Sequence, residues 1–447
     1  MADPSGSARS AKPVSVGEGS CANAAGLAGG TDAVAGVAVG AAADPAGDDP
    51  AGAAGESGVA GASSGATAEA AVSPMWRSSF PAMGTRVDLI GWGGDGMAIV
   101  NAIVEVVARH EDLWSVFRVS SEVSRLNAAV ASAGGGEGVS RHLAESAEAS
   151  AGLVVSEDTD RLLRGALALA EATGGAFNPM IGPLVAAWDV RAMRAAFVAG
   201  APLPPAPSSR VVEAALRASS WGLLSRVGER RWAVGVPAES VGGVDAPSPR
   251  LDLGGIAKGD TADACRDLAV SMGARGVLVS VGTSSVSVSG TRADGSPWRA
   301  GLRDPHGAPT AIAGVVELPA DGMASLSTSG DNLGPLGDAR ALCAGPVSER
   351  VSERAADLRA RETSRETPGG GGRIFDHHII DPRTGYPARS GVRQVSVVAS
   401  SGVLAEALST ALLVDPSIDV SDVAARWARA MGAPASAKVV GLVRAAR

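Results

Sequence analysis

The chain contains few cysteines and few aromatic residues, and it has no long hydrophobic run. Its three cysteines, Cys21, Cys265 and Cys343, lie far apart in 447 residues, so the sequence predicts neither a disulfide framework nor a zinc site. No segment approaches the ~20 strongly apolar residues that cross a bilayer, and no basic start followed by an apolar run indicates a signal peptide. We therefore expect no transmembrane segment and a cytoplasmic location.

Residues 1–74 lack aromatic side chains and any periodic hydrophobic pattern, and they consist mostly of Ala, Gly, Ser, Asp, Pro and Val. This composition is typical of disorder. Eight acidic and two basic residues give this segment a net charge of −6 of the −8 on the whole chain. The remainder is near neutral and has no basic stripe with interleaved aromatic residues, so we predict a disordered tail and no nucleic-acid partner.

Periodic patterns begin near residue 75 and continue to about residue 445. Helices are predicted at 97–117, 161–173, 256–272, 403–413 and 420–431, and strands at 85–90, 277–281, 285–288, 298–302, 311–317, 394–399 and 438–443. Runs of strands joined by turns, without regular crossover helices, favour a layered α+β fold. Residues 333–372 contain the near-repeat VSERVSER and four consecutive glycines, which predicts a surface insertion.

The segment GWGGDG at residues 91–96 fits the glycine pattern of dinucleotide-binding folds and follows a predicted strand. That fold also needs a second strand that ends in an acidic residue about twenty positions later. Glu111 and Asp112 stand there, but they fall inside the continuing predicted helix. We therefore interpret the segment as a glycine-rich turn.

The segment LDLGGIAKGD at residues 251–260 combines Asp252, two glycines and Lys258 at the start of a predicted helix. Backbone amides and a lysine at a helix N-terminus suit a phosphorylated ligand. A plain strand-to-helix turn with a surface lysine fits the same residues equally well.

The segment FDHHIIDPRTGYP at residues 375–387 places His377 and His378 between Asp376 and Asp381. The lack of nearby cysteines and of helical i, i+4 spacing argues against a zinc site. A general acid or base fits better. The alternative is a turn with a capping aspartate and solvent-facing histidines, which suits His377 more than His378.

Glu406, Ser409 and Thr410 share one face of a predicted helix. A single carboxylate with two hydroxyls is a thin oxygen set for a hard cation, and magnesium is usually held in this way, with waters or substrate phosphates completing its shell. The alternative is an ordinary polar helix face.

Taken in order along the chain, the motifs resemble the ApbE family of FAD:protein FMN transferases. The resemblance covers residues 75 to about 445 apart from the insertion, and it rests on AMGT at 82–85, WSVF at 114–117, SEVSRLN at 121–127, GGAFNP at 174–179, DLGGIAKG at 252–259, STSGD at 327–331, HIIDPRTG at 378–385 and AEALSTA at 405–411. It implies an α+β, T-fold-like arrangement of layered sheet and helices around a central FAD cleft.

The resemblance also implies a reaction and its site. FMN would move from FAD to a threonine or serine of an acceptor flavoprotein, with release of AMP and with Mg²⁺ as cofactor. The residues implied to line the FAD site are Met83, Phe117, Ala176, Phe177, Asn178, Asp252, Lys258 and Ile380. Those implied to hold the metal are the backbone carbonyl of Gly255 with Glu406, Ser409 and Thr410. We expect His378 to take or orient the proton of the acceptor hydroxyl, and Asp381 to steady that turn.

The sequence departs from the family pattern at three places. The family usually has aspartate at the positions of Glu406 and Asn178, and Gly-Gly-Asn where this chain has GTS at 282–284. Two other hypotheses stay open: a magnesium-dependent FAD pyrophosphatase, in which water replaces the acceptor hydroxyl at an identical site, and a non-catalytic flavin-binding protein with a disabled metal site.

Overall fold

The structure, a computed structural model, describes residues 37–38, 75–134, 152–199, 201–237, 247–305, 311–319, 321–330 and 378–444. The insertion predicted at 333–372, His377 and nearly all of the N-terminal tail lie outside these residues. Within the tail, Val37–Ala38 forms a short strand, β1, that pairs with strand β9. For the rest of the tail, disorder stays a prediction.

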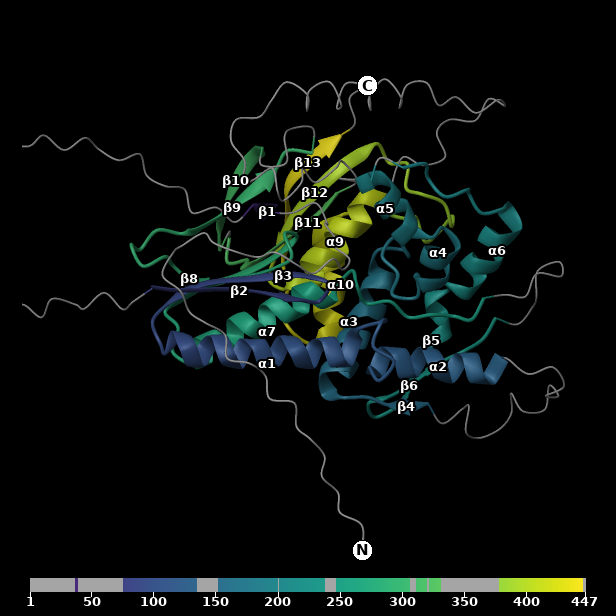
Figure 1. Cartoon of the computed structure of the whole chain (residues 1–447), viewed down its shortest axis with the longest axis horizontal. Coiled ribbons are helices and arrows are strands. Elements are labelled where there is room, and N and C mark those ends of the chain that lie inside the picture. Colours follow the sequence, from purple (N-terminus) through teal and green to yellow (C-terminus); the bar gives the residue numbers. More distant parts are fainter. Residues whose placement is uncertain are drawn as a thin grey trace, which may run out of the picture.

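A seven-stranded sheet, antiparallel at every pairing, forms the centre of the fold (Figure 1). Its order is β13 (Ala437–Arg444), β12 (Val392–Ala399), β11 (Ser325–Gly330), β8 (Ser285–Gly290), β7 (Gly276–Val281), β3 (Thr85–Trp92) and β2 (Met75–Ala82). Two three-stranded sheets flank it, β1–β9–β10 and β4–β6–β5. Their other strands are β9 (Trp298–Arg303), β10 (Ile312–Leu318), β4 (Leu153–Val154), β5 (Leu224–Gly228) and β6 (Arg231–Val234).

The helices lie along the central sheet and beyond one end of it. Figure 1 shows α1 and α7 below strands β2 and β3, α9 at the centre, and α4 to α6 together on the right. The helices are α1 (Gly96–Trp114), α2 (Glu122–Gly134), α3 (Glu157–Ala172), α4 (Gly182–Ala187), α5 (Val190–Ala199), α6 (Ser209–Ala218), α7 (Ala257–Ser271), α9 (Gly402–Val414) and α10 (Val420–Met431), with a 3₁₀ turn η2 (Trp221–Leu223). In the part of the chain that is described, none of them is long and apolar enough to span a bilayer.

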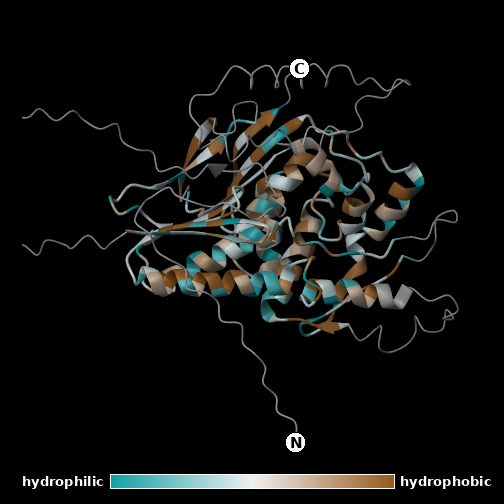
Figure 2. Cartoon of the chain, viewed as in Figure 1, coloured by the Kyte–Doolittle hydropathy of each residue, from teal (hydrophilic) through white to brown (hydrophobic). Residues whose placement is uncertain are grey.

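Alternation along strand β7 explains why the central sheet is covered on both faces. Val277, Val279 and Val281 are buried with residues of α1 and α7, whereas Leu278 belongs to a cluster that includes Trp298 of β9. Successive side chains of a strand point to opposite faces, so the helices cover one face and the β9–β10 sheet covers the other. Figure 2 shows hydrophobic residues along the strands, and hydrophobic alternating with hydrophilic residues along α1.

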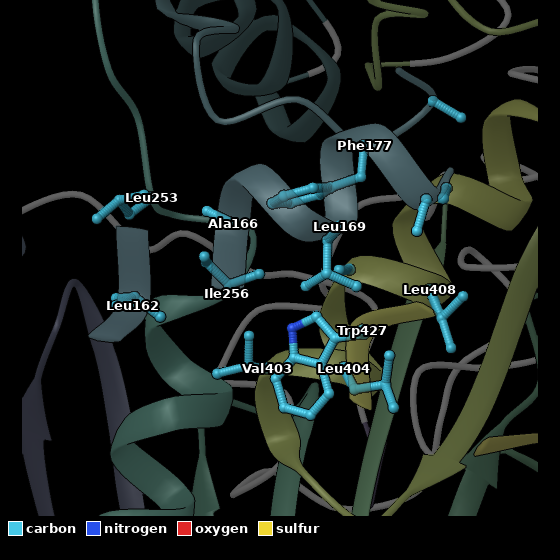
Figure 3. Close-up of a cluster of buried hydrophobic side chains, with 14 of the residues drawn as sticks. Leu162, Ala166, Leu169, Phe177, Leu253, Ile256, Val403, Leu404, Leu408 and Trp427 are labelled. Atoms are coloured by element: carbon cyan, nitrogen blue, oxygen red, sulfur yellow. The ribbon is translucent and has the colours of Figure 1, made fainter. Parts of the chain in front are cut away.

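A second core lies behind the loops that precede α4 and α7. Figure 3 shows Phe177, Leu253 and Ile256 of these loops meeting α3, α9 and the indole of Trp427 on α10. All of them are buried. Removing such side chains from water contributes ~1.5–3 kcal/mol each, so this cluster ties both loops to α9.

The glycine-rich segment at residues 91–96 comprises the end of β3, a turn at 93–95 and the first residue of α1, and it has a structural role. Gly91 and Gly96 border the ring of Trp76, and a Cβ at Gly91 would lie 2.2 Å from Trp76 Cζ2. The Trp76 indole donates to the carbonyl of Gly93 at 3.1 Å. Asp95 caps α1 by accepting from two backbone amides at its start. The glycines leave room for an aromatic ring and show no nucleotide-binding arrangement.

Candidate functional site

A cavity of about 190 Å³ lies where α7 begins, beside the middle of α9. It is lined by Gly254, Gly255, Lys258, Ser284, Ser327, Ser329, Gly330, His378, Ile379, Glu406 and Thr410. The fold thus brings together residues of segments 251–260, 327–330, 378–385 and 405–411. Ligand pockets usually measure ~300–1,000 Å³, so this cavity suits the reacting part of a dinucleotide and not the whole molecule.

Contacts from distant segments shape the loop before α7. The side-chain amide of Asn127 donates to the carbonyl of Leu251 at 3.0 Å and accepts from the Leu251 amide at 2.7 Å. The amide of Asp252 donates to the carbonyl of Pro179 at 2.8 Å. The Asp252 carboxylate in turn accepts from the amide of Gly254 at 2.9 Å. Asp252 therefore builds the turn and is not among the cavity-lining residues.

Lys258 and Glu406 face each other in the cavity. The Lys258 ammonium donates to the carbonyl of Gly254 at 2.9 Å and lies 3.4 Å from Glu406 Oε1. Glu406 Oε2 accepts from the amide of Gly259 at 2.8 Å, and Oε1 accepts from the hydroxyl of Ser285. The Glu406 side chain is only 5 % exposed, and a buried carboxylate needs such partners to keep its charge.

A group of hydroxyls surrounds the next turn of α9. Ser409 Oγ donates to the carbonyl of Glu406 at 3.0 Å. Ser329 Oγ lies 2.8 Å from Ser409 Oγ and 3.2 Å from Thr410 Oγ1, and Ser327 Oγ lies 3.2 Å from Ser409 Oγ. Among the described residues no group of three or more His, Cys, Asp or Glu side chains is arranged to hold a metal. A cation here would depend on one carboxylate, hydroxyls and carbonyls.

His378 and Ile379 both line the cavity, whereas Ile380 does not. Ile380 is 4 % exposed and packs in a separate core with Leu184 and Trp188. The family resemblance instead implied that Ile380 lines the FAD site. Residues 378–379 form a bend that leads into a single bridge at Ile380, and Ile380 packs in the core beyond it. The bend brings consecutive side chains to one cavity.

Asp381 organises the turn that follows His378. Its carboxylate accepts from the backbone amide of Arg383 at 2.9 Å and from the guanidinium at 3.1 and 3.2 Å. Its carbonyl accepts from the amide of Gly385 at 2.9 Å. The Arg383 guanidinium also donates to Asp415 at 2.9 Å, which ties the turn to the end of α9. The geometry agrees with a steadying role for Asp381 and gives it no place in the cavity.

The predicted FAD-lining residues of the GGAFNP motif lie behind the cavity. Phe177 is 5 % exposed, and a Cβ added to Gly255 would lie 3.5 Å from its ring. Ala176 is 1 % exposed and belongs to the core. Phe177 therefore packs beside Gly255 and does not itself line the cavity.

Asn178, a third predicted FAD-lining residue, braces its own loop. Its side-chain amide donates to the carbonyl of Ser219 at 2.7 Å, and its side-chain oxygen accepts from the amide of Met180 at 2.8 Å. The side chain is buried, so in this structure both of its polar groups serve the protein itself.

Met83 and Phe117 lie outside the cavity. Met83 has a positive φ of 53°, and its amide donates to Glu111 at 2.6 Å. Phe117 is 74 % exposed, and the guanidinium of Arg191 lies 6.0 Å from its ring centroid. A ligand that touched these residues as well would have to extend beyond the described cavity.

Serines from β8, β11 and the turn before β8 complete the site, and the sequence motifs assigned them no role. Strands β8 and β11 read SVSVSG and SLSTSG, and alternate residues of a strand share one face. The rows at Ser285 and Ser287 and at Ser325, Ser327 and Ser329 therefore face the helices together. This alternation is visible in the sequence, and it identifies a hydroxyl-rich surface.

A profile of the ApbE family matches residues 83–335 and 356–432. The chain belongs to the ApbE family. The FAD:protein FMN transferase of Treponema pallidum (strain Nichols) is 33 % identical over 272 residues, which are 59 % of this chain and 62 % of that protein. The FAD:protein FMN transferase of Rhodobacter capsulatus is 29 % identical over 333 residues, 74 % of this chain and 49 % of that protein. The chain thus spans about half to two thirds of the length of these relatives.

Two solved structures show the same fold. The flavin transferase ApbE from Vibrio cholerae is 21 % identical with a TM-score of 0.53, and the match covers 83 % of this chain and 97 % of that one. The ApbE protein from Thermotoga maritima MSB8 is 25 % identical with a TM-score of 0.54 and the same coverage. The predicted α+β class and the family resemblance are both confirmed.

Proposed function

We propose that this chain transfers the FMN half of FAD to a threonine or serine hydroxyl of an acceptor protein and releases AMP, with Mg²⁺ as cofactor. The observation that carries the proposal is the meeting of Lys258, Glu406 and His378 in one hydroxyl-lined cavity of an ApbE-family chain. The names of the similar proteins from Treponema pallidum and Rhodobacter capsulatus support it.

The oxygen groups around α9 fit a hard cation. The Lys258 ammonium lies between the carbonyl of Gly254 and Glu406 Oε1, so a positive charge already stands between a carbonyl and a carboxylate oxygen, two kinds of ligand that suit magnesium. Glu406, Ser409 and Thr410, with the carbonyl of Gly255, would hold the ion. Bound there, it would neutralise the phosphate charge that develops as the pyrophosphate breaks.

The residues of the chain would position the substrate and balance its charge. Lys258 and the amides of the loop before α7 would face the pyrophosphate. His378, at the cavity wall, would take the proton of the acceptor hydroxyl as that oxygen attacks the FMN-side phosphorus and AMP leaves. Phosphoryl transfer depends mainly on such positioning and charge neutralisation, and the nucleophile belongs to the acceptor. An activated serine or cysteine of the enzyme is therefore not required.

Incubation with FAD, MgCl₂ and synthetic peptides that each carry one threonine or serine tests the proposal. Mass spectrometry of the peptides and chromatography of AMP should show an FMN adduct and AMP in equal amounts, and EDTA should remove both. AMP without an adduct would identify a pyrophosphatase. FAD binding without AMP would identify a non-catalytic flavin-binding protein.

A further inference from the structure

Asp263 lies in the middle of α7, behind the cavity, and links three other elements. Its Oδ1 accepts from the hydroxyl of Ser287 on β8 at 2.7 Å and from that of Ser325 on β11 at 2.6 Å. Its Oδ2 accepts at 2.6 Å from the amide of Gly402, the first residue of α9. The guanidinium of Arg266 donates to Oδ1 at 3.0 Å. Burial raises the pKa of the Asp263 carboxyl, and the charge of Arg266 opposes that rise.

Each of the three elements that hydrogen-bond to Asp263 also contributes a residue to the cavity or to its Glu406 contacts. Gly402 lies one helical turn before Glu406 on α9. On β8 and β11 the serines bonded to Asp263 lie two residues from Ser285 and Ser327. Ser285 donates to Glu406 and Ser327 lines the cavity. One carboxylate thus connects the three elements whose relative position sets the distances in the cavity.

A second contact, one turn earlier on α7, completes the link to α9. The amide of Gly259 donates to Glu406 Oε2, and a Cβ at Gly259 would lie 2.3 Å from the carbonyl oxygen of Gly402. Gly259 and Asp263 are four residues apart, as are Gly402 and Glu406. Two contacts at this spacing fix both the rotation and the sliding of α9 against α7.

Arg266 does not depend on Asp263 alone for charge compensation. Its Nε donates to Asp267 at 2.8 Å, and the Asp267 side chain is 67 % exposed. The Arg266 guanidinium therefore pairs with two carboxylates: Asp263, which also accepts from Gly402 at the start of α9, and Asp267, which has no contact with α9 among those described. This makes Asp267 a matched control for Asp263.

We propose that Asp263 is a positioning residue that sets where α9 places Glu406 opposite Lys258, and that it thereby tunes cation binding in the cavity without touching the substrate. The inference rests on the proposed function for its metal. Its geometric part concerns the unliganded protein and can be tested independently.

Asp263→Asn tests the link with almost no change of shape. Four donors meet the Asp263 carboxylate, from Ser287, Ser325, Arg266 and the amide of Gly402. Asparagine offers one oxygen and adds an NH₂ donor, so these donors compete for it and the amide of Gly402 loses its fixed partner. We expect faster hydrogen exchange of residues 402–406 in Asp263→Asn than in wild type, measured by mass spectrometry without FAD or metal. Asp267→Asn should exchange as wild type does.

The functional readout separates cation binding from FAD binding. In Asp263→Asn, the Mg²⁺ concentration that gives half-maximal AMP release should rise about tenfold, the effect of losing one charge-assisted hydrogen bond. The Kd for FAD, measured by fluorescence quenching without metal, should stay within about threefold of wild type, and saturating Mg²⁺ should restore most of the rate. Asp267→Asn should leave all three quantities unchanged.

Equal behaviour of the two asparagine variants would overturn the proposal, as would unchanged exchange at 402–406 in Asp263→Asn. If Asp263→Asn does not fold, Ser287→Ala/Ser325→Ala removes from both strands the hydroxyls that bond Asp263 and Arg266, while the contacts of Asp263 with Arg266 and with the amide of Gly402 remain. It should also raise the Mg²⁺ requirement, and an unchanged requirement would count against the proposal. If wild type released no AMP, the proposed function would fail, whereas the exchange experiment would still decide the positioning role.

Discussion

Gly259→Ala probes the close crossing of α7 and α9 directly. A Cβ at position 259 would lie 2.3 Å from the carbonyl oxygen of Gly402 and 2.4 Å from its carbonyl carbon. Ordinary contacts begin near 3.4 Å, so the helices would have to separate by roughly 1 Å. Such overpacking costs about 1–3 kcal/mol, partly offset by the ~1 kcal/mol that alanine gains over glycine inside a helix. The difference is a net loss of up to about 2 kcal/mol.

The same separation should affect catalysis more than stability. The amide of Gly259 donates to Glu406, and Lys258 stands beside it, so a 1 Å shift moves these groups relative to each other. A misplacement of that size costs about 100-fold in rate. We expect Gly259→Ala to lower the midpoint of thermal unfolding by no more than about 3 °C and AMP release by about two orders of magnitude.

Gly165→Ala is the matched control. Gly165 lies inside α3, and a Cβ there would meet Trp427 at 3.4 Å, which is an ordinary contact. This variant should keep full activity and be as stable as wild type or slightly more so. If both alanine variants unfold and react as wild type does, the close packing of α7 on α9 does not set the site, and the reasoning is refuted.

The remaining predictions concern the metal, the proton and pH. Glu406→Ala should abolish AMP release while Glu406→Asp keeps it, and equal activity of wild type and the alanine variant would remove Glu406 from the metal site. His378→Ala should slow transfer by at least ~100-fold with little change in FAD affinity, and His377→Ala should do much less. Parallel loss of rate and FAD affinity in His378→Ala would show a structural role instead. Burial lowers the pKa of His110 below its ordinary 6.5, so the unfolded chain binds the proton first, and stability should fall as pH drops below 6.5. Chemical unfolding at pH 7 and pH 5 should show this fall in wild type, and a fall of equal size in His110→Gln would contradict the assignment.

Apolar periodicity predicted five strands of the central sheet, the β9–β10 pair and helices α1, α3, α7, α9 and α10, because it depends on local sequence, whereas α2, α4 to α6 and the β4–β6–β5 sheet were not predicted. The helix predicted at 403–413 is α9, Gly402–Val414, and the strand predicted at 277–281 is β7, Gly276–Val281. β2 was missed because only Trp76 among its residues is buried, so its apolar pattern is weak. β11 was missed because its buried positions are mostly serine and threonine, which carry little hydropathy signal.

The sequence motifs predicted some residues of the candidate site and misplaced others. Lys258, His378 and Glu406 were each recognisable beside a turn or a helix start, and the structure places all three at one cavity. The roles of Ile380 and Asn178 depend on a bend and on a long-range partner, the carbonyl of Ser219. No local pattern encodes either feature. Long-range pairings of this kind decide which face a residue presents, and a single sequence does not reveal them.

The most direct test of the central claim is quantitative mass spectrometry of an acceptor peptide after incubation with the chain and FAD, with and without Mg²⁺. The account predicts one FMN added to a threonine or serine for each AMP released, only when Mg²⁺ is present, and no adduct with Glu406→Ala. AMP release without any adduct, or an adduct that forms equally well in EDTA, would contradict it.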